Sequence, residues 1–480
     1  MTLAAVNPVQ SLLAASSAWA PLAARLAAEA AIVTQDGREA GARRLGAAGI
    51  DLPDTARVAL VVTDPFLFIR LLVALDGRVA AILLLSYGLP GDQVTHLVRA
   101  AGCDTVLTDR ADLLGAALDD VAVLAAGTAL VDSAQSAVFQ DTLWLLTTSG
   151  TTSGTTGGPT GLPKIVSHHL GGLAAAVRPK RAGDPQPIWG HVIDPARLAG
   201  VLVMLQALVG GGRLVVADPG ASLAQQIAGL AAGGVTHLSC TPTLWRRILM
   251  LPDYAALRLT QITLGGETAD TATLRALSVA WPAARISHIY ASTEAGQGFS
   301  VTDGRAGFPA AWLKGAPGGL AGGLGLDLRE GVLWLQPPLQ ARGASRTGPR
   351  IGIEADAAGF IRTGDLVEMR GDRVMFLGRE SGLINVAGVK VWPEVVEAVI
   401  KAVPGVGLVQ ISARKSPVTG ALVVAEVQLV EGADPVVLKP LILAACRAGL
   451  PREAVPASIR FVVALATNAA GKLLRPGPKA

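Results

Sequence analysis

Cysteine is scarce in this sequence of 480 residues. The three cysteines, Cys103, Cys240 and Cys446, lie far apart and form no CxxC pair. This spacing argues against a zinc site, and the small number indicates a chain without disulfides in a reducing compartment. Charge is sparse too, with 16% charged residues and a formal net charge of +4. So weak a bias gives no reason to expect nucleic acid or an anionic membrane as a partner.

A long uncharged apolar run is also missing, although the mean hydropathy is high at +0.46. The longest such run extends from Leu198 to Gly212 and contains Gln206. It is shorter than the roughly 18 to 20 residues that a membrane-spanning helix needs. The apolar start of the chain has no lysine or arginine before Arg25, so we expect no secretory signal. These absences predict a soluble, cytoplasmic protein with no membrane partner.

Apolar residues, by contrast, make up 51% of the chain, enough to bury a large core. Between Arg57 and Asp109, strand-like runs alternate with helical patterns: strands are expected over 58–63, 80–84 and 105–107, and helices over 66–75 and 91–101. The alternation resumes after Pro187, with strands expected over 213–217, 235–239, 261–265 and 286–290. This pattern predicts an α/β fold in which helices cover parallel-type sheets.

The composition changes in the last third of the chain. Glycine, proline and short β-like runs between about Gly296 and Asp372 predict a small β-barrel-like subdomain attached to the large lobe. A compact α+β unit follows, with strands expected over 389–391, 408–413, 421–429 and 459–463, and helices beginning at Pro393 and near Asp434. We therefore predict two domains, a multi-subdomain lobe over residues 1–379 and a small domain over residues 380–480.

One segment differs in composition from the rest, the stretch from Thr147 to Lys164 that is rich in glycine, serine and threonine. After a strand, such a loop offers unshielded backbone N–H groups, a row of hydroxyls and one lysine, which together suit a polyphosphate. A flexible linker has the same composition, so from the residues alone both interpretations stay open. A Walker A loop is excluded because Lys164 follows proline and precedes isoleucine.

Three further segments combine residues that could act on a nucleotide. Ile289-Tyr-Ala-Ser-Thr-Glu-Ala-Gly296 ends a predicted strand with a hydroxyl and a carboxylate, and a solvated surface loop is the alternative. Arg362-Thr-Gly-Asp-Leu366 brings a carboxylate to a glycine turn, where it could accept hydrogen bonds from a ribose or simply form a turn. Gly471-Lys472, near the end of the chain, has little specificity by itself.

Taken in order, these segments resemble the core motifs of the adenylate-forming (AMP-binding) superfamily, which includes acyl- and aryl-CoA synthetases, luciferases and adenylation domains of peptide synthetases. The loop resembles the family's Thr-Ser-Gly-Thr-Thr-Gly-x-Pro-Lys pattern, and Tyr290 to Glu294 its Tyr-Gly-x-Thr-Glu. Thr363-Gly-Asp365 resembles its Thr-Gly-Asp, and Gly378-Arg379 through Gly388 together with Pro393-Glu394 resembles its crossover motif. Gly471-Lys472 resembles the segment that carries its terminal catalytic lysine. The resemblance covers roughly residues 55 to 475.

The resemblance implies an ATP- and Mg²⁺-dependent reaction in which a carboxylate attacks the α-phosphorus and a thiol then displaces AMP. It implies that the β- and γ-phosphates are bound by Thr148, Ser149, Gly150, Thr151, Thr152, Ser153, Gly154, Thr155, Thr156 and Lys164. Thr293 would contact the α-phosphate, Glu294 would bind the metal, and Lys472 would bridge the acid and the phosphate.

The remaining motif residues acquire roles from the same resemblance. Gly265, Gly266, Glu267 and Tyr290 would flank the adenine, and Asp365 would hold the ribose with Arg379 nearby. The segment around Gly388 would line a thiol tunnel after the C-terminal domain rotates as a mobile lid.

The sequence departs from the family in three places. Ser-Gly-Thr-Thr occurs twice in the loop, at 149–152 and 153–156, and either copy could meet the phosphates. Ser381 stands where the hinge usually carries aspartate or lysine. Ala291 replaces the usual glycine and adds a methyl group at the expected wall of the acyl pocket.

The substrate pocket is expected to include Arg197, Leu198, Gly200 and Ala291. Arg197 falls where CoA ligases often have histidine or an aromatic residue, with a surface salt bridge as its alternative role. An ungapped count back from Gly211 puts Leu198 where amino-acid-activating domains carry an aspartate. An aliphatic side chain cannot pair with an ammonium group, so the acid is not expected to be an α-amino acid.

The sequence therefore predicts a ligase that uses ATP and Mg²⁺ to make an acyl- or aryl-adenylate and transfers the acyl group to coenzyme A. A freestanding enzyme that loads the phosphopantetheine of a separate carrier protein is the first alternative. A nucleotide-binding protein that has lost turnover is the second.

Overall fold

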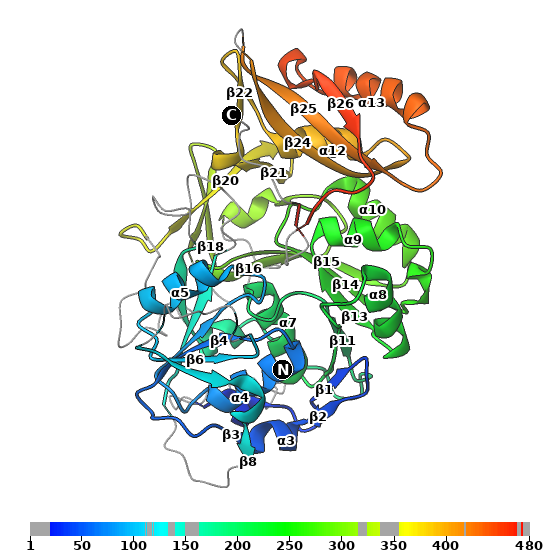
Figure 1. Cartoon of the computed structure of the whole chain (residues 1–480). Helices are drawn as coiled ribbons and strands as arrows, with labels where there is room; N and C mark the ends of the chain where they lie inside the picture. The colour runs from blue at the N-terminus through cyan, green and yellow to red at the C-terminus, as the bar shows by residue number, and fades with distance from the viewer. Residues whose placement is uncertain are drawn as a thin grey trace, which may run out of the picture. The chain divides into compact units, whose positions relative to one another are not determined.

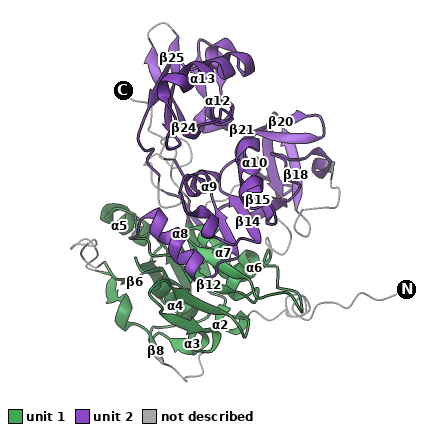
Figure 2. Cartoon of the chain, turned by 90° about the vertical axis from the view of Figure 1, so that its right-hand side faces the viewer, with its two compact units in different colours: residues 1–146, 167–220, 340–351 green, residues 147–166, 221–339, 352–480 purple. Residues whose placement is uncertain are grey.

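The computed structural model describes residues 20–110, 112, 118, 120–132, 140–148, 163–314, 324–336, 355–416, 419–467 and 472–473 (Figure 1). The chain divides into two compact units (Figure 2). Unit 1 comprises residues 1–146, 167–220 and 340–351, and unit 2 comprises residues 147–166, 221–339 and 352–480.

Unit 1 contains a six-stranded sheet in the order β10-β9-β5-β4-β6-β7. Its strands are β4 (Arg57–Val61), β5 (Ala81–Leu84), β6 (Thr105–Thr108), β7 (Ala122–Ala125), β9 (Leu143–Thr147) and β10 (Ile165–His169). β4 pairs in parallel with β5 and β6, as the alternating pattern predicts. The connecting helices are α4 (Pro65–Leu75) and α5 (Gly91–Ala100). α4 is apolar on nearly every side, and nine of its residues are buried.

Four further strands of unit 1 lie in the order β11-β12-β1-β2: β1 (Ala31–Thr34), β2 (Glu39–Gly41), β11 (Ile188–His191) and β12 (Arg213–Val216). β12 pairs in parallel with both β1 and β11. The apolar run that begins at Leu198 forms α7 (Leu198–Leu208). Short elements complete the unit: α2 (Leu22–Arg25), α3 (Ala42–Ala47), β3 (Ala48–Gly49), β8 (Val131–Asp132) and α6 (Leu170–Ala174).

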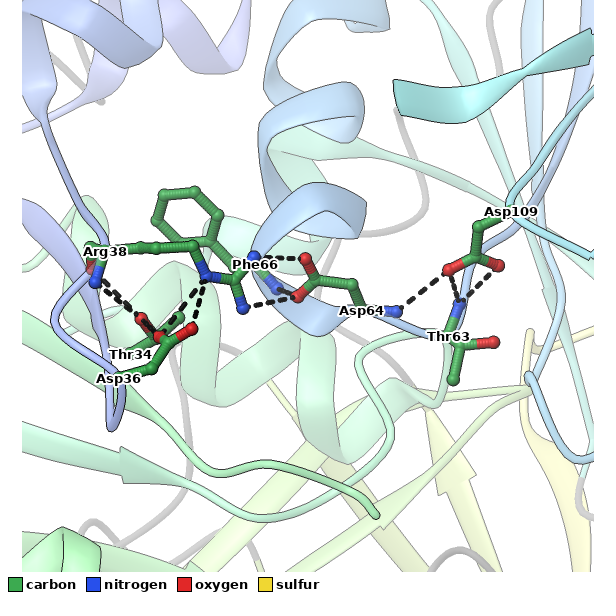
Figure 3. Close-up of polar contacts among 7 residues, drawn as sticks. All are labelled: Thr34, Asp36, Arg38, Thr63, Asp64, Phe66 and Asp109. Atoms are coloured by element: carbon green, nitrogen blue, oxygen red, sulfur yellow. Dashed lines mark hydrogen bonds and ion pairs between the residues drawn. The ribbon is translucent and has the colours of Figure 1, made fainter. Parts of the chain in front are cut away.

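A polar network fixes the start of α4 (Figure 3). The Asp64 carboxylate accepts a hydrogen bond from the Phe66 N–H and so caps the helix. The Arg38 guanidinium forms an ion pair with Asp64 and lies 5.0 Å from the centre of the Phe66 ring. The Asp109 carboxylate accepts from the Thr63 N–H at 2.8 Å. This network joins the β1–β2 hairpin and the end of β6 to one helix terminus.

Unit 2 begins with strands β13 (His237–Cys240), β14 (Gln261–Gly265) and β15 (Arg285–Ser292), which pair in parallel. β16 (Gly296–Val301) adds an antiparallel edge to β15. The helices of this region are α8 (Leu223–Ala232), α9 (Pro242–Leu249) and α10 (Thr271–Ala280). Threonine or aspartate side chains cap the N-termini of α9 and α10.

The β-rich stretch forms a five-stranded antiparallel sheet in the order β17-β21-β20-β19-β18. Its strands are β17 (Phe308–Pro309), β18 (Gly325–Arg329), β19 (Val332–Gln336), β20 (Ile361–Arg370) and β21 (Arg373–Arg379). Buried aromatic and aliphatic side chains, including Phe299, Phe308 and Trp312, form its core. With the mixed sheets and helices, this half-barrel confirms the predicted fold class.

The last part of unit 2 contains β22 (Ile384–Val386), β23 (Val389–Val391), α12 (Pro393–Lys401), β24 (Val406–Ser416), β25 (Gly420–Leu429), α13 (Pro435–Gly449) and β26 (Ser458–Phe461). One hydrophobic cluster unites buried residues from Ile384 to Ile459. The proposed domain boundary after Arg379, where β21 ends, stays a prediction. No helix within the described residues combines the length and apolar character that crossing a bilayer requires.

Candidate active site

The glycine pair predicted to flank the adenine lies at the carboxyl end of β14. Gly265 ends the strand, and Gly266 has a φ of +77°, which glycine adopts without strain. The next residue, Glu267, accepts a hydrogen bond from the Thr243 N–H at 2.9 Å. Its carboxylate therefore helps to cap α9, because Thr243 belongs to the first turn of that helix.

Tyr290, Asp365 and Arg379 form one hydrogen-bonded cluster. The Tyr290 hydroxyl donates to Asp365 Oδ2, and Arg379 Nε donates to Asp365 Oδ1 at 3.0 Å. Burial, together with the Asp365 charge, raises the pKa of Tyr290 well above its usual value, so the phenol stays protonated and can donate. The Asp365 carboxylate also raises the pKa of Arg379.

The Asp365 side chain is presented by a tight turn within β20. The Thr363 hydroxyl donates to the Leu333 carbonyl at 2.7 Å, and the Asp365 N–H donates to the Thr363 oxygen at 3.1 Å. Gly364 has a φ of +72° at the centre of this turn. The Thr-Gly-Asp pattern thus has a local reason: a hydroxyl anchor, a residue free to take a positive φ, and the carboxylate that the turn presents.

Two aromatic rings lie parallel to Tyr290. The Phe299 ring centroid lies 5.2 Å from that of Tyr290, with 11° between the planes, because the two residues are directly opposite in the β15–β16 ladder. The Phe376 ring of β21 lies 5.5 Å away at 7°. Stacked rings of this kind hold the tyrosine in one orientation.

Lys472 lies beside Gly266, although the two residues are far apart in the sequence. A Cβ atom built on Gly266 would approach Lys472 Cε to 3.1 Å and Nζ to 3.3 Å. Leu473 forms an isolated antiparallel bridge with Thr467, which holds the segment that carries the lysine.

These residues meet in one cavity of about 530 Å³. Of the predicted site residues, the cavity is lined by Gly266, Glu267, Tyr290, Ala291, Asp365, Arg379 and Lys472. The volume lies in the range of small-molecule and nucleotide sites. Asp365 and Arg379 bring charges of both signs next to the half-buried ring of Tyr290. Such a lining suits a ligand that is both charged and aromatic.

Thr293 and Glu294 occupy the turn between β15 and β16 and are both partly buried. The negative charge of Glu294 contributes to the raised pKa of Arg379, so the carboxylate lies close to that cluster. Among the described residues, no group of three or more histidine, cysteine, aspartate or glutamate side chains could hold a metal by itself. Mg²⁺ in nucleotide sites needs only one or two carboxylates beside the phosphates. The role of Glu294 as a metal ligand stays a prediction.

The predicted phosphate loop is described only at its two ends. The Thr148 N–H donates to the Lys164 carbonyl at 2.9 Å, and the Lys164 N–H donates to the Thr148 hydroxyl at 3.0 Å. This pair of bonds closes the base of the loop, and the Lys164 side chain is exposed. The intervening predicted residues, Ser149, Gly150, Thr151, Thr152, Ser153, Gly154, Thr155 and Thr156, lie outside the described residues.

Gly388 is not part of the cavity. It lies in the turn between β22 and β23 with a φ of +89°, and its N–H donates to Asn385 Oδ1 at 2.9 Å. The residue is exposed.

The predicted acyl-pocket residues of unit 1 lie at the start of α7. Arg197 precedes the helix and is half-buried beside Asp194, whose charge opposes the lowering of the Arg197 pKa by burial. Ser86 donates a hydrogen bond to the same carboxylate, which is 3% exposed. The arginine is therefore near a buried carboxylate, and its role in the acyl pocket stays a prediction.

Leu198 and Gly200 belong to the first turn of α7. The Leu198 side chain is buried, with 8% of its surface exposed. A Cβ atom on Gly200 would lie 2.3 Å from the Asp194 carbonyl oxygen, so only glycine allows this close approach. Burial lowers the pKa of the neighbouring His191 to about 4, and the ring nitrogen Nε2 lies 3.1 Å from the Gly200 carbonyl.

The sequence interpretation missed several residues of the cavity. Arg246 of α9 and Phe376 of β21 line it, beside Glu394 of the predicted crossover motif. The adjacent pair Arg246-Arg247, at the end of an amphipathic helix, was the one available signal.

The chain belongs to the AMP-binding enzyme family, which matches residues 39–318. It is 28% identical over 442 residues to a probable non-canonical nonribosomal peptide synthetase, CymA, of Salinispora arenicola, a match that covers 85% of this chain and 5% of the synthetase. It is 36% identical over 128 residues to a 2-succinylbenzoate–CoA ligase of Geobacillus kaustophilus, covering 26% of each protein. The chain therefore spans only a small part of the length of these relatives.

The fold is also that of a solved structure, the anthranilate CoA ligase AuaEII in complex with anthranoyl-AMP. The TM-score is 0.76 with 16% identity, and the match covers 96% of this chain and 97% of that one. Together with the family match, this confirms the resemblance to the adenylate-forming superfamily.

Proposed function

We propose that this protein uses ATP to activate a carboxylic acid as an acyl- or aryl-adenylate. The observation that carries the proposal is the position of Lys472 beside Gly266, in the cavity that also holds Tyr290, Asp365 and Arg379. A partly buried carboxylate, that of Asp365, beside an aromatic ring suits a ribose and an adenine. A single ammonium group delivered to the same cavity suits the charge that develops when a carboxylate meets a phosphate.

The first half-reaction joins an oxygen of the acid to the α-phosphorus and breaks the bond to pyrophosphate. Two anions must approach each other, so the Lys472 ammonium would lower the barrier by neutralising charge between them. Asp365 would accept hydrogen bonds from the ribose hydroxyls, held in place by Tyr290 and Arg379. Thr293 would donate to the α-phosphate from the β15–β16 turn.

Glu294 would hold Mg²⁺ together with the phosphates, and the ion would supply positive charge for them. Lys164 and the hydroxyls of the loop that begins at Thr148 would bind the β- and γ-phosphates. The exposed lysine at the closed base of that loop supports this assignment.

The second half-reaction would transfer the acyl group to a thiol, with AMP as the leaving group. We assign this thiol to a phosphopantetheine group, which carries the thiol of coenzyme A and is also attached to carrier proteins. The CoA ligase names of two similar proteins support coenzyme A as the acceptor. For this step the part of the chain after Arg379 would rotate and bring Gly388 to the site, with Ser381 near the pivot.

The acid is proposed not to be an α-amino acid. Leu198, at the start of α7, is aliphatic and buried, so it offers an ammonium group no partner. Ala291, whose backbone lies in β15, adds a methyl group to the cavity wall and would shorten the acyl pocket.

Cys103, Cys240 and Cys446 are all free and buried, which supports the expectation of a reducing, cytoplasmic environment.

Acid-dependent exchange of labelled pyrophosphate into ATP tests the activation step. We expect at least one acid from a panel of fatty, aryl and dicarboxylic acids to support exchange, and the twenty amino acids to support none. Products formed with coenzyme A and with a phosphopantetheinyl carrier are then compared by mass spectrometry. Absence of exchange across the panel would contradict the proposal and leave a nucleotide-binding protein without turnover.

A further inference from the structure

Helix α9 of unit 2 contacts the turn after β14 at its N-terminus and β24 at its C-terminus, and Figure 1 labels these elements. At its N-terminus, the Thr243 N–H is bonded to Glu267, the neighbour of Gly266. At its C-terminus, α9 packs against β24. One end of helix α9 therefore contacts the segment that carries Gly266. The other end contacts β24, which belongs to the C-terminal part of the chain, as Lys472 does.

Arg246 makes the central contact. Its Nη1 donates to the Gly407 carbonyl at 3.0 Å, and its Nη2 lies within hydrogen-bond distance, 3.3 Å, of the Lys401 carbonyl. Lys401 is the last residue of α12, where carbonyl groups lack helical partners and favour a cation. The side chain is 11% exposed, and its Nε donates to the Thr273 hydroxyl at 2.8 Å. One guanidinium thus ties α9 and α10 to the end of α12 and the start of β24.

Close packing accompanies these hydrogen bonds. A Cβ atom on Gly407 would lie 2.8 Å from the sulfur of Met250, which directly follows α9. Glycine at this position therefore lets β24 approach the helix closely enough for the Arg246 bond to its backbone.

Arg247 contacts the segment that bears the lysine. Its Nη1 donates to the Thr467 hydroxyl at 3.0 Å, and Thr467 is the bridge partner of Leu473. Helix α9 is therefore linked to the segment of Lys472 by the Arg247–Thr467 hydrogen bond and the Thr467–Leu473 bridge.

We propose that Arg246 and Arg247 are positioning residues for the adenylation step. They hold the end of α12, the start of β24 and Thr467 against α9, so that the Lys472 ammonium stays beside Gly266. The inference rests on the proposed function of Lys472, but the placement of that side chain can be measured without any substrate. Ordinary structural arginines would stabilise the fold without distinguishing one half-reaction from the other.

The first experiment measures how fast an amine-acylating ester modifies Lys472, followed by mass spectrometry with the exposed Lys439 as internal reference. Arg246→Ala and Thr467→Val should each raise the rate at Lys472 several-fold. Thr467→Ser keeps the hydroxyl acceptor, and Arg275→Ala changes an exposed arginine of α10, so both should match the wild type. Unchanged labelling of Lys472 in both test variants overturns the proposal.

The second experiment compares the two half-reactions in the same variants. We expect Arg246→Ala to lower acid-dependent pyrophosphate exchange about 100-fold, the loss typical of a misplaced catalytic group. Acyl transfer from a supplied acyl-adenylate to the thiol should stay within about twofold, because Lys472 is not needed for it. A parallel loss of both half-reactions would indicate a purely structural role and overturn the proposal. Absence of exchange in the wild type would instead refute the proposed function and leave the labelling result intact.

Discussion

The side chain of Lys472 lies so close to Gly266 that a Cβ atom at position 266 would make the lysine shift by a few tenths of an ångström. The nearest approach of a built Cβ is 3.1 Å to Lys472 Cε. This relationship joins the carboxyl end of β14 to the C-terminal end of the chain, and it defines the cavity in which we place the chemistry.

Gly266→Ala should therefore impair adenylation. The added methyl group would displace Lys472, and the φ of +77° would strain any residue with a Cβ. We expect pyrophosphate exchange to fall about 10-fold or more, as for a catalytic group moved by a fraction of an ångström.

Gly304→Ala is the matched control for this substitution. Gly304 also has a positive φ, +73°, but a Cβ there meets nothing within 4 Å. It carries the backbone strain without the crowding, so its exchange rate should be close to that of the wild type. Equal losses in the two variants would assign the effect to strain and contradict the role of the Lys472 contact.

Tyr290→Phe should weaken ATP binding. The ring and its stacking on Phe299 and Phe376 remain, but Asp365 loses the hydrogen bond that fixes one of its oxygens. Loss of one such bond costs about 1 kcal/mol, which predicts an increase of about fivefold in KM for ATP with little change in kcat.

The control is Tyr254→Phe. The ring of Tyr254 packs edge-on against Trp281, and its hydroxyl is not the one that donates to Asp365. Steady-state kinetics with varied ATP should give the wild-type KM for this variant. An unchanged KM in Tyr290→Phe would contradict the orienting role of the phenol.

A buried carboxyl of unit 1 makes stability depend on pH. Asp76 accepts hydrogen bonds from the Leu22 N–H at 2.7 Å and from Trp144 Nε1 at 2.6 Å. Burial nevertheless raises the pKa of Asp76 to about 6. The folded state therefore binds a proton more tightly than the unfolded state, whose aspartate pKa is about 3.9. The resulting stability is fully present below about pH 3.9 and is lost as the pH rises through about 6.

Urea unfolding of the wild type and of Asp76→Asn between pH 4 and 7 checks whether stability decreases as the pH rises. The free energy of unfolding of the wild type, relative to the non-titrating variant, should decrease by up to about 3 kcal/mol as the pH rises. A difference that stays flat or grows with pH would show that the carboxyl is not held in its protonated form.

The sequence predicted those parts of the fold that depend on local pattern. β14 has the expected bounds, Gln261 to Gly265, because an apolar run there is limited by polar and glycine residues. α13 begins one residue after Asp434, whose side chain caps it, and continues through Pro440 to Gly449. The antiparallel edge strands β2 and β16 were not predicted, because neither contains an apolar run that marks a strand in the sequence.

The site could be predicted only where a motif concentrates its chemistry in a few neighbouring residues, as in Thr363-Gly-Asp365. Arg246 donates to the backbone carbonyls of Lys401 and Gly407, which any residue type provides, so the Arg246-Arg247 pair in the sequence does not reveal the partners of this side chain. The stacking of Phe376 on Tyr290 depends likewise on contacts between elements distant in the chain.

The most direct test of the role of Lys472 in adenylation is to measure both half-reactions in the variant Lys472→Ala. Loss of the ammonium group should reduce acid-dependent pyrophosphate exchange by about 100-fold or more, because the charge on the reacting anions is no longer neutralised. Acyl transfer from a supplied acyl-adenylate should continue at the wild-type rate, as it should in a control variant, Lys439→Ala, for both half-reactions. Exchange at the wild-type rate in Lys472→Ala, or an equal loss of both half-reactions, would contradict the account.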